Sequence, residues 1–201
     1  MASSDKGIEI PEGNPVREYS PEEARQLTEN LRELLRGIRA GQFADRRIDS
    51  ALVQDFHAAV FGGIRGFAGR LRSRSFGSEY LTFGPHRSMH RNAVPDALEK
   101  VARHAARRLE EALSGPVTLE QTDVLLRTAL HFHNDLIRIH PFEDGNGRTA
   151  RAFLSLFLVR AGLPPIAFEV PRQEYLDSLN TYFLTRDEEP LMSLVLELLA
   201  R

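Results

Sequence analysis

The sequence predicts a mainly α-helical domain that carries one small β-hairpin. Apolar residues recur at helical spacing through most of the chain, and capping residues, glycine or proline mark the ends of these runs. Only Tyr80-Leu81-Thr82-Phe83 has the composition of a short strand. The length of 201 residues and a hydrophobic content of 42% fit one compact domain with a core of its own.

The N-terminal part divides into two segments. Residues 1–19 are polar, and we interpret them as an N-terminal arm. Ser20-Pro21-Glu22-Glu23 has the residue types of a helix start, and Gly41 ends the apolar run that follows. We therefore expect an N-terminal helix and linker over residues 20–44 and the main domain over residues 45–201.

A glycine-rich stretch interrupts the helices at residues 62–92. A helix that begins near Asp49 stops at Gly62-Gly63, and Tyr80–Phe83 supplies one strand of a hairpin. We interpret the arginines here as part of a solvated loop and not as a nucleic-acid surface, because the net charge of the chain is −2. These arginines are Arg65, Arg70, Arg72, Arg74, Arg87 and Arg91.

The second half of the chain predicts a further series of helices. They are expected at residues 95–112, after the capping box Thr118-Leu119-Glu120-Gln121, at 149–161, around 175–179 and around 191–198. His131 and His133 do not form a metal pair in this reading, since residues two apart on a helix do not face each other.

The composition also bears on the compartment. The chain has no cysteine, which excludes disulfides and fits a reducing environment. Its apolar runs are too short to span a bilayer, and its polar start lacks the apolar core of a signal peptide. We expect a cytoplasmic protein without a membrane partner, or one delivered into a host cell by a signal-independent route.

Residues 140–151 combine features that bind anions. They read His140-Pro141-Phe142-Glu143-Asp144-Gly145-Asn146-Gly147-Arg148-Thr149-Ala150-Arg151. Pro141 ends one helix and the next helix begins at once, so its free N–H groups point into the loop. Gly145 and Gly147 let the backbone approach a ligand closely. The segment therefore predicts an anion site at a helix N-terminus.

Four side chains in and beside this anion site indicate which reaction it could catalyse. Arg148 and Arg151 lie three residues apart and can reach the same anion, and guanidinium groups bind phosphate in a bidentate manner. Asp144 fits such a loop when Mg²⁺ lies between its carboxylate and the phosphates. The pKa of His140 permits proton abstraction near neutrality. Together these groups predict phosphate-ester transfer.

The same segment resembles the signature of the Fic family, HPFx[D/E]GNGRxxR, at every fixed position. Gly162-Leu163-Pro164-Pro165 and the arginine-rich hairpin also resemble this family's core and its target-docking flap. We extend the resemblance over about residues 45–200. It implies a Fic-fold helical bundle with a small β-hairpin flap.

The resemblance implies a role for each matching residue. His140 would be the general base, Asp144 would hold Mg²⁺ and Phe142 would be a buried wedge that fixes the loop. The phosphates of ATP would be bound by Gly145, Asn146 (backbone and side chain) and Gly147, and the β- and γ-phosphates would be neutralised by Arg148 and Arg151. Tyr175 would contact adenine. The target would pair by β-augmentation with the flap residues Tyr80, Leu81, Thr82 and Phe83.

The implied activity is that of a protein adenylyltransferase, which moves AMP from ATP to a hydroxyl side chain of a target protein. Relatives of the Doc type are kinases and carry a lysine at the second glycine of GNGR, whereas this chain has Gly147. UMP transfer, Doc-like kinase activity and a catalytically silent binding module remain alternatives. Intact His140 and Asp144 argue against the silent module.

Control of the activity is a separate question. Many Fic proteins carry an inhibitory helix with the pattern [S/T]xxxE[G/N], and this chain has no clean match; Glu12-Gly13, for example, follows Ile8 where Ser or Thr is required. We therefore expect either a separate antitoxin-like inhibitor, as in toxin-like systems, or an acid of residues 20–40 that meets Arg148. The candidate acids are Glu22, Glu23, Glu29 and Glu33.

Overall fold

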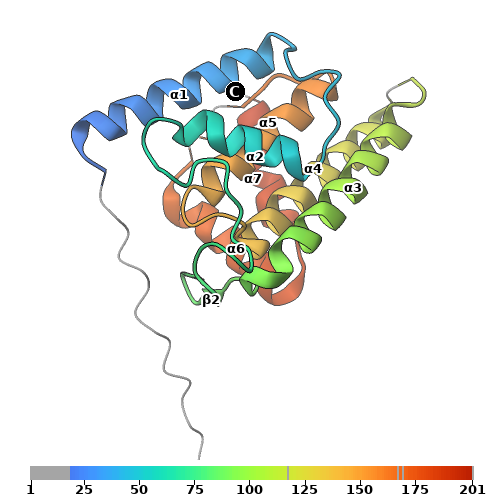
Figure 1. The fold of residues 1–201 in the computed structure, drawn as a ribbon. Coiled ribbons are helices and arrows are strands. Elements are labelled where there is room, and N and C mark those ends of the chain that lie inside the picture. Colours follow the sequence, from blue (N-terminus) through green and yellow to red (C-terminus); the bar gives the residue numbers. More distant parts are fainter. Residues whose placement is uncertain (1–18, 117, 167, 169, 201) are drawn as a thin grey trace, which may run out of the picture.

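The computed structural model describes residues 19–116, 118–166, 168 and 170–200. Its elements are α1 (Pro21–Arg39), α2 (Ser50–Phe61), β1 (Thr82–Phe83), β2 (His86–Arg87), η1 (Arg91–Ala93), α3 (Val94–Leu113), α4 (Leu119–Ile139), α5 (Asn146–Arg160), α6 (Arg172–Thr185) and α7 (Glu189–Leu199) (Figure 1). The mainly helical architecture with one small hairpin is confirmed.

Helices α4 and α5 form the centre of the bundle. They pack against each other, α3 lies along α4, and α1 and α2 cover α5. Figure 1 shows α3 and α4 as a long pair that ends in a short connection, with α1 and α2 near α5. Because α4 leads directly into α5, the loop between them is anchored by two buried helices.

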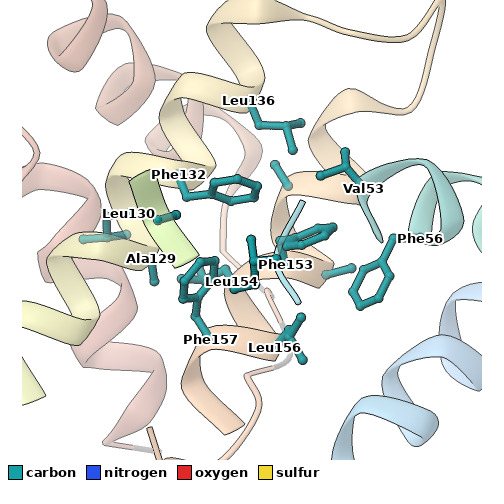
Figure 2. Close-up of a cluster of buried hydrophobic side chains, with 14 of the residues drawn as sticks. Val53, Phe56, Ala129, Leu130, Phe132, Leu136, Phe153, Leu154, Leu156 and Phe157 are labelled. Carbon is teal, nitrogen blue, oxygen red and sulfur yellow. The ribbon is translucent and has the colours of Figure 1, made fainter. Parts of the chain in front are cut away.

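Aromatic side chains fill the core between α2, α4 and α5. Phe153 of α5 lies with its ring centroid 4.5 Å from that of Phe56 and 5.1 Å from that of Phe132. Phe157 extends the cluster along α5, and leucine side chains surround it (Figure 2). Burial of these rings contributes the largest hydrophobic term per side chain and fixes how α5 lies against its neighbours.

The expected helix starts are present at both capping boxes. Ser20 and Glu23 cap α1 reciprocally, and Thr118 and Gln121 do the same for α4. Helix α5 begins at Asn146, three residues before the predicted start. The reason is Gly145, which takes a left-handed conformation as N-cap and accepts hydrogen bonds from both the backbone and the side chain of Thr149.

The hairpin is shorter than the sequence predicted, because Tyr80 and Leu81 lie before β1. Thr82 pairs with Arg87 and Phe83 with His86. At Leu81 the backbone N–H bonds to the hydroxyl of Ser88 at 2.8 Å instead of to a backbone carbonyl. Because a side-chain hydroxyl takes the place of the backbone acceptor, the regular hydrogen bonding between the strands ends after two residue pairs.

Two arginines of the glycine-rich loop contradict the solvated-loop interpretation. Arg72 is fully buried and Arg65 nearly so, at 0% and 7% exposure. Arg65 ion-pairs with Glu23 of α1, and Arg72 bonds to backbone oxygens. Sequence composition does not reveal this because buried arginines require partners that come from distant segments.

None of the helices formed by the described residues has both the length and the apolar character needed to cross a membrane. Residues 1–18 of the predicted N-terminal arm, including Glu12-Gly13, lie outside the described residues.

Candidate active site

The chain reverses direction between α4 and α5 within six residues, 140–145. His140 at the end of α4 has φ 54° and ψ 61°, and Gly145 before α5 has φ 79°. His140 is one of two residues other than glycine with positive φ among those described. Such a conformation is unfavourable for most side chains, so the surroundings must stabilise it.

Glycine is required at position 145 for two reasons. Its positive φ is rarely adopted by other residues, and a Cβ atom there would lie 2.1 Å from the ring of Phe61. The close approach of Phe61 to the backbone therefore fixes the start of α5. This position was predicted as a phosphate-binding glycine, and the structure adds a packing reason for it.

Asn146 holds the loop together from within. Its side-chain oxygen accepts a hydrogen bond from the Phe142 N–H, and its side-chain nitrogen donates to the Phe142 carbonyl, both at 2.9 Å. The amide was predicted to bind phosphate oxygens. In the structure it is buried and bonded to Phe142, and its contact with phosphate stays a prediction.

Phe142 is fully buried, as expected of a wedge, and its ring stacks on His57 of α2. The ring centroids are 3.7 Å apart. Nδ1 of His57 accepts a hydrogen bond from the Gly69 N–H at 2.8 Å, so Nε2 carries the proton and donates to the Asp144 carbonyl at 3.0 Å. His57 therefore fixes the loop from the α2 side.

The side chain of His140 is held as a neutral ring. Nδ1 donates to the Ile137 carbonyl at 3.1 Å, which leaves the lone pair on Nε2. Burial lowers the pKa of His140 to about 4, below the near-neutral value that the sequence analysis expected. The ring also stacks on Phe83 of β1, with centroids 4.5 Å apart and planes 5° from parallel. The structure thus places the predicted base against the predicted flap.

Asp144 and Arg148 both contact a residue that the sequence analysis had assigned to the N-terminal arm. The hydroxyl of Tyr19 donates to Oδ2 of Asp144, and Nη1 of Arg148 donates to the same hydroxyl at 3.3 Å. Oδ1 of Asp144 accepts the Gly145 N–H at 2.6 Å. The predicted metal ligand and the predicted phosphate ligand are therefore neighbours.

Three of the four candidate acids of α1 have partners of their own. Glu23 ion-pairs with Arg65 at 2.5 Å, and the exposed Glu29 and Glu33 pair with Arg32 and Arg36 of the same helix. A carboxylate from α1 on Arg148 stays a prediction, while Tyr19 supplies an observed contact to this arginine.

Arg151 lies beside the ring of Tyr175. The Arg151 guanidinium is 5.4 Å from the centroid of the Tyr175 ring. The Tyr175 hydroxyl bonds to Nε2 of His133 at 3.0 Å, and Nδ1 of His133 bonds to Asn134. Tyr175 is buried at 8% exposure, so its observed contacts support Arg151; its contact with adenine stays a prediction.

The hairpin is fastened to α6 as well as to His140. Phe83 and His86 both contact the ring of Phe183, and Nε2 of His86 bonds to Oδ1 of Asn180 at 2.8 Å. Leu81 is buried, while Tyr80 is 38% exposed and its ring lies under the Arg87 guanidinium. The hairpin is present where the flap was predicted, and target docking on it stays a prediction.

Sequence reasoning missed four residues that organise this site: Tyr19, His57, Arg72 and Glu143. His57 lies on the apolar face of a helix, where histidine is commonly structural, so its pattern carries no signal. Glu143 occupies the variable position of the motif and accepts hydrogen bonds from both the backbone and the hydroxyl of Ser78. Only the clustering of arginines near residue 72 drew attention beforehand.

The described residues contain no group of three or more His, Asp or Glu side chains that could hold a metal by themselves. Asp144 is a single carboxylate at the start of α5. Mg²⁺ is usually held by one or two carboxylates together with substrate phosphates. The donor set therefore fits Mg²⁺ that arrives with a nucleotide.

Comparison with known proteins agrees with this geometry. The Fic/DOC family model matches residues 47–158. The proteins named protein adenylyltransferase fic-1 from Caenorhabditis briggsae and Caenorhabditis elegans are 51% identical over 49 residues, which is 24% of this chain and 10% of each relative. The chain thus matches about a tenth of the length of these relatives.

Solved structures extend the similarity of fold to nearly the whole chain. The N-terminal FIC domain of Bep8 from Bartonella sp. 1-1C has a TM-score of 0.72 at 16% identity and covers 97% of this chain and 93% of that one. BepC from Bartonella tribocorum, solved with bound AMPPNP, has a TM-score of 0.63 at 16% identity and covers 87% and 86%. The fold and the loop between α4 and α5 define a Fic-type protein. The chain belongs to the Fic/DOC family.

The buried histidines predict an acid-sensitive fold. Burial lowers the pKa of His133 to about 4, whereas an unfolded histidine titrates near 6.5. The unfolded state therefore binds the proton first, and the stabilisation is complete above pH 6.5 and is lost as the pH falls towards 4. Each such histidine lowers the free energy of unfolding by about 1.4 kcal/mol per pH unit in this window.

Urea unfolding between pH 7.5 and 4.5 measures this effect. We expect His133→Gln to give a shallower fall than the wild type, because one titrating group is removed. His104→Gln, at an exposed position of α3, controls for the substitution itself. Equal slopes for the wild type and His133→Gln would show that His133 does not titrate between the two states.

Proposed function

We propose that this chain transfers AMP from ATP to the hydroxyl of a Ser, Thr or Tyr side chain in another protein. The observation that carries the proposal is the neutral His140 ring, whose Nδ1 is bonded to Ile137 and whose face lies on Phe83 of the hairpin. A neutral imidazole with a free Nε2 lone pair is suited to accept a proton from a hydroxyl.

The bonds change as follows in the proposed reaction. Nε2 of His140 takes the proton of the target hydroxyl while the hydroxyl oxygen bonds to the α-phosphorus. The bond from the α-phosphorus to the oxygen that bridges to the β-phosphorus breaks, and pyrophosphate leaves with the electron pair. The N–H groups at the start of α5, Arg148 and Arg151 stabilise the negative charge on the phosphates.

Asp144 would hold Mg²⁺ in this proposal, and the ion would neutralise part of the charge on the phosphates of ATP. The protein's own contribution is to fix the carboxylate. Oδ1 is held by the Gly145 N–H and the backbone carbonyl of Asp144 by His57. Positioning of this kind is the main catalytic resource in phosphate transfer.

Relatives support the choice of nucleotide and reaction. The matched nematode proteins are named protein adenylyltransferases, and the structurally similar BepC was solved with AMPPNP, an ATP analogue. Gly147 adds support from the chain itself, since a lysine there is the Doc-type feature. Doc-like phosphate transfer remains as an outcome of the experiment below, and α-labelled UTP in place of labelled ATP would detect UMP transfer.

We further propose a target protein as partner, held on the hairpin through residues 80–83. Exposed Tyr80 and the short strand β1 offer an edge for an extended segment. An antitoxin-like inhibitor and a toxin-like role belong to the same proposal. The lack of cysteine supports action in a reducing compartment such as the cytoplasm.

Labelled ATP tests the reaction directly. Incubation of the protein with a lysate, Mg²⁺ and either α-labelled or γ-labelled ATP should label a protein from the α position alone. His140→Ala should lower this labelling by about 10²–10⁴-fold, because the general base is lost, and should leave ATP affinity nearly unchanged. His131→Ala is the matched control, since His131 is an exposed residue of α4 that pairs with Glu188.

The other outcomes are equally informative. Label from the γ position alone would identify a kinase. Binding of ATP without any protein label would identify a binding module, and near-normal labelling by His140→Ala would contradict the assignment of the base.

A further inference from the structure

Arg72 is a fully buried arginine between α2 and the hairpin. Its guanidinium donates to six uncharged oxygens. They are the carbonyl oxygens of His140 (2.8 Å), Ile139 (3.2 Å), Ser78 (3.0 Å), Glu79 (3.3 Å) and Met89 (3.0 Å), and the hydroxyl of Ser88 (3.1 Å). The backbone N–H of Arg72 adds a bond to the Pro141 carbonyl at 2.8 Å.

One side of this guanidinium holds the turn at His140. The carbonyls of Ile139 and His140 belong to the two peptide planes that flank the His140 Cα atom. Arg72 therefore fixes the orientation of both planes and stabilises the left-handed conformation, φ 54°, from which the imidazole projects. These carbonyls also form the negative end of α4, where a cation is favourable.

The other side holds the base of the hairpin. Ser78 and Glu79 precede β1, and Ser88 and Met89 follow β2, so the same cation joins the entry and the exit of the hairpin. Glu143 of the loop adds a second tie through the backbone and hydroxyl of Ser78. Burial lowers the pKa of Arg72, and the negative charge of Glu143 offsets part of that lowering.

We propose that Arg72 is a positioning residue that sets the place of His140 relative to the hairpin. The inference deepens the proposed function and rests on it. In that function the target hydroxyl hangs from a segment bound on the hairpin and must reach Nε2 of His140. A displacement of about 1 Å between reacting groups lowers rates by about 10²-fold. A rigid cation between hairpin and base prevents such a displacement.

Arg72→Lys tests this role, because a single ammonium group keeps the charge but cannot reach both sides. Arg107→Lys is the control at an exposed position of α3. We expect the single-turnover rate of target labelling, per folded molecule and well below the unfolding temperature, to fall on the order of 10–100-fold. The Kd for ATP should stay within about threefold, which is less than 1 kcal/mol.

Nitrogen NMR of the His140 ring reads the same geometry without any turnover. We expect one tautomer, protonated at Nδ1, in the wild type and averaged ring nitrogens in Arg72→Lys. If Arg72→Lys fails to fold, Ser88→Ala replaces it in the test, because this variant removes one partner of the Arg72 guanidinium. We expect Ser88→Ala to change the ring signals and the labelling rate in the same direction as Arg72→Lys, but by a smaller amount.

Unchanged ring signals and an unchanged labelling rate in the variant that folds would overturn the positioning role, even if that variant unfolds at a lower temperature. A wild type that shows the single tautomer but labels no protein would instead overturn the proposed function, while the ring signals still decide the role of Arg72.

A separate observation concerns Tyr19, directly before α1. Its hydroxyl bonds to Asp144 and accepts from Arg148, and its ring lies 4.5 Å from the Arg65 guanidinium. Arg65 is in turn paired with Glu23, the residue that closes the capping box of α1. The segment before α1 thus places the Tyr19 hydroxyl between Asp144 and Arg148, the groups proposed to hold Mg²⁺ and phosphate.

We infer that Tyr19 is an obstructing contact, which must leave Asp144 before the nucleotide and Mg²⁺ bind. This inference also rests on the proposed function. The Tyr19 hydroxyl takes one oxygen of the carboxylate and one nitrogen of Arg148, and both are needed by the incoming ligands. Removal of the Tyr19 hydroxyl removes both hydrogen bonds from the obstructed state and so favours the open site.

Calorimetric titration with ATP, carried out once in the presence of Mg²⁺ and once in the presence of EDTA, tests the obstruction. Tyr19→Phe should tighten binding of Mg²⁺ and ATP by about tenfold, which corresponds to about 1.4 kcal/mol, and should change binding in EDTA less. Tyr182→Phe on α6 is the matched control.

Unchanged or weaker binding by Tyr19→Phe would overturn the obstruction and assign Tyr19 a supporting role for Asp144. If neither the wild type nor Tyr19→Phe binds ATP, the proposed function fails and the obstruction fails with it.

Discussion

The double hydrogen bond between the Asn146 side chain and the Phe142 backbone is the contact on which the site depends. It closes the loop between α4 and α5 at the point where the chain must reverse within six residues. The buried Phe142 ring lies on His57, and Gly145 lies on Phe61, so the loop is held against α2 on two sides. The core between α2, α4 and α5 therefore determines the shape of this loop, where the anion site is predicted.

From this loop the functional groups diverge in defined directions. His140 projects from the end of α4 towards the hairpin, whereas Asp144 and Arg148 project towards the start of α1. Arg72 joins the backbone at His140 to the hairpin, whereas Tyr19 contacts Asp144 on the side of α1. In the proposed reaction, the target and the nucleotide would therefore approach one loop from sides that different segments of the chain control.

The helices could be predicted from the sequence because their signals are local. The helix start at Ser20 and the capping box at Thr118 were confirmed for this reason. The role of Arg72 could not be predicted, because all but one of the partners of its guanidinium are backbone oxygens. The number of such atoms within reach of a side chain is known only once distant segments are packed. Composition alone made Arg72 look solvated, whereas it is fully buried.

Hydrogen exchange across residues 140–148, with and without ATP and Mg²⁺, tests the central claim that the loop is built before the nucleotide binds. The account predicts that the Phe142 amide, bonded to Asn146, exchanges slowly already in the free protein. It also predicts that added nucleotide slows the amides at the start of α5. A Phe142 amide that exchanges as fast as an unstructured peptide until ATP is added would contradict the account.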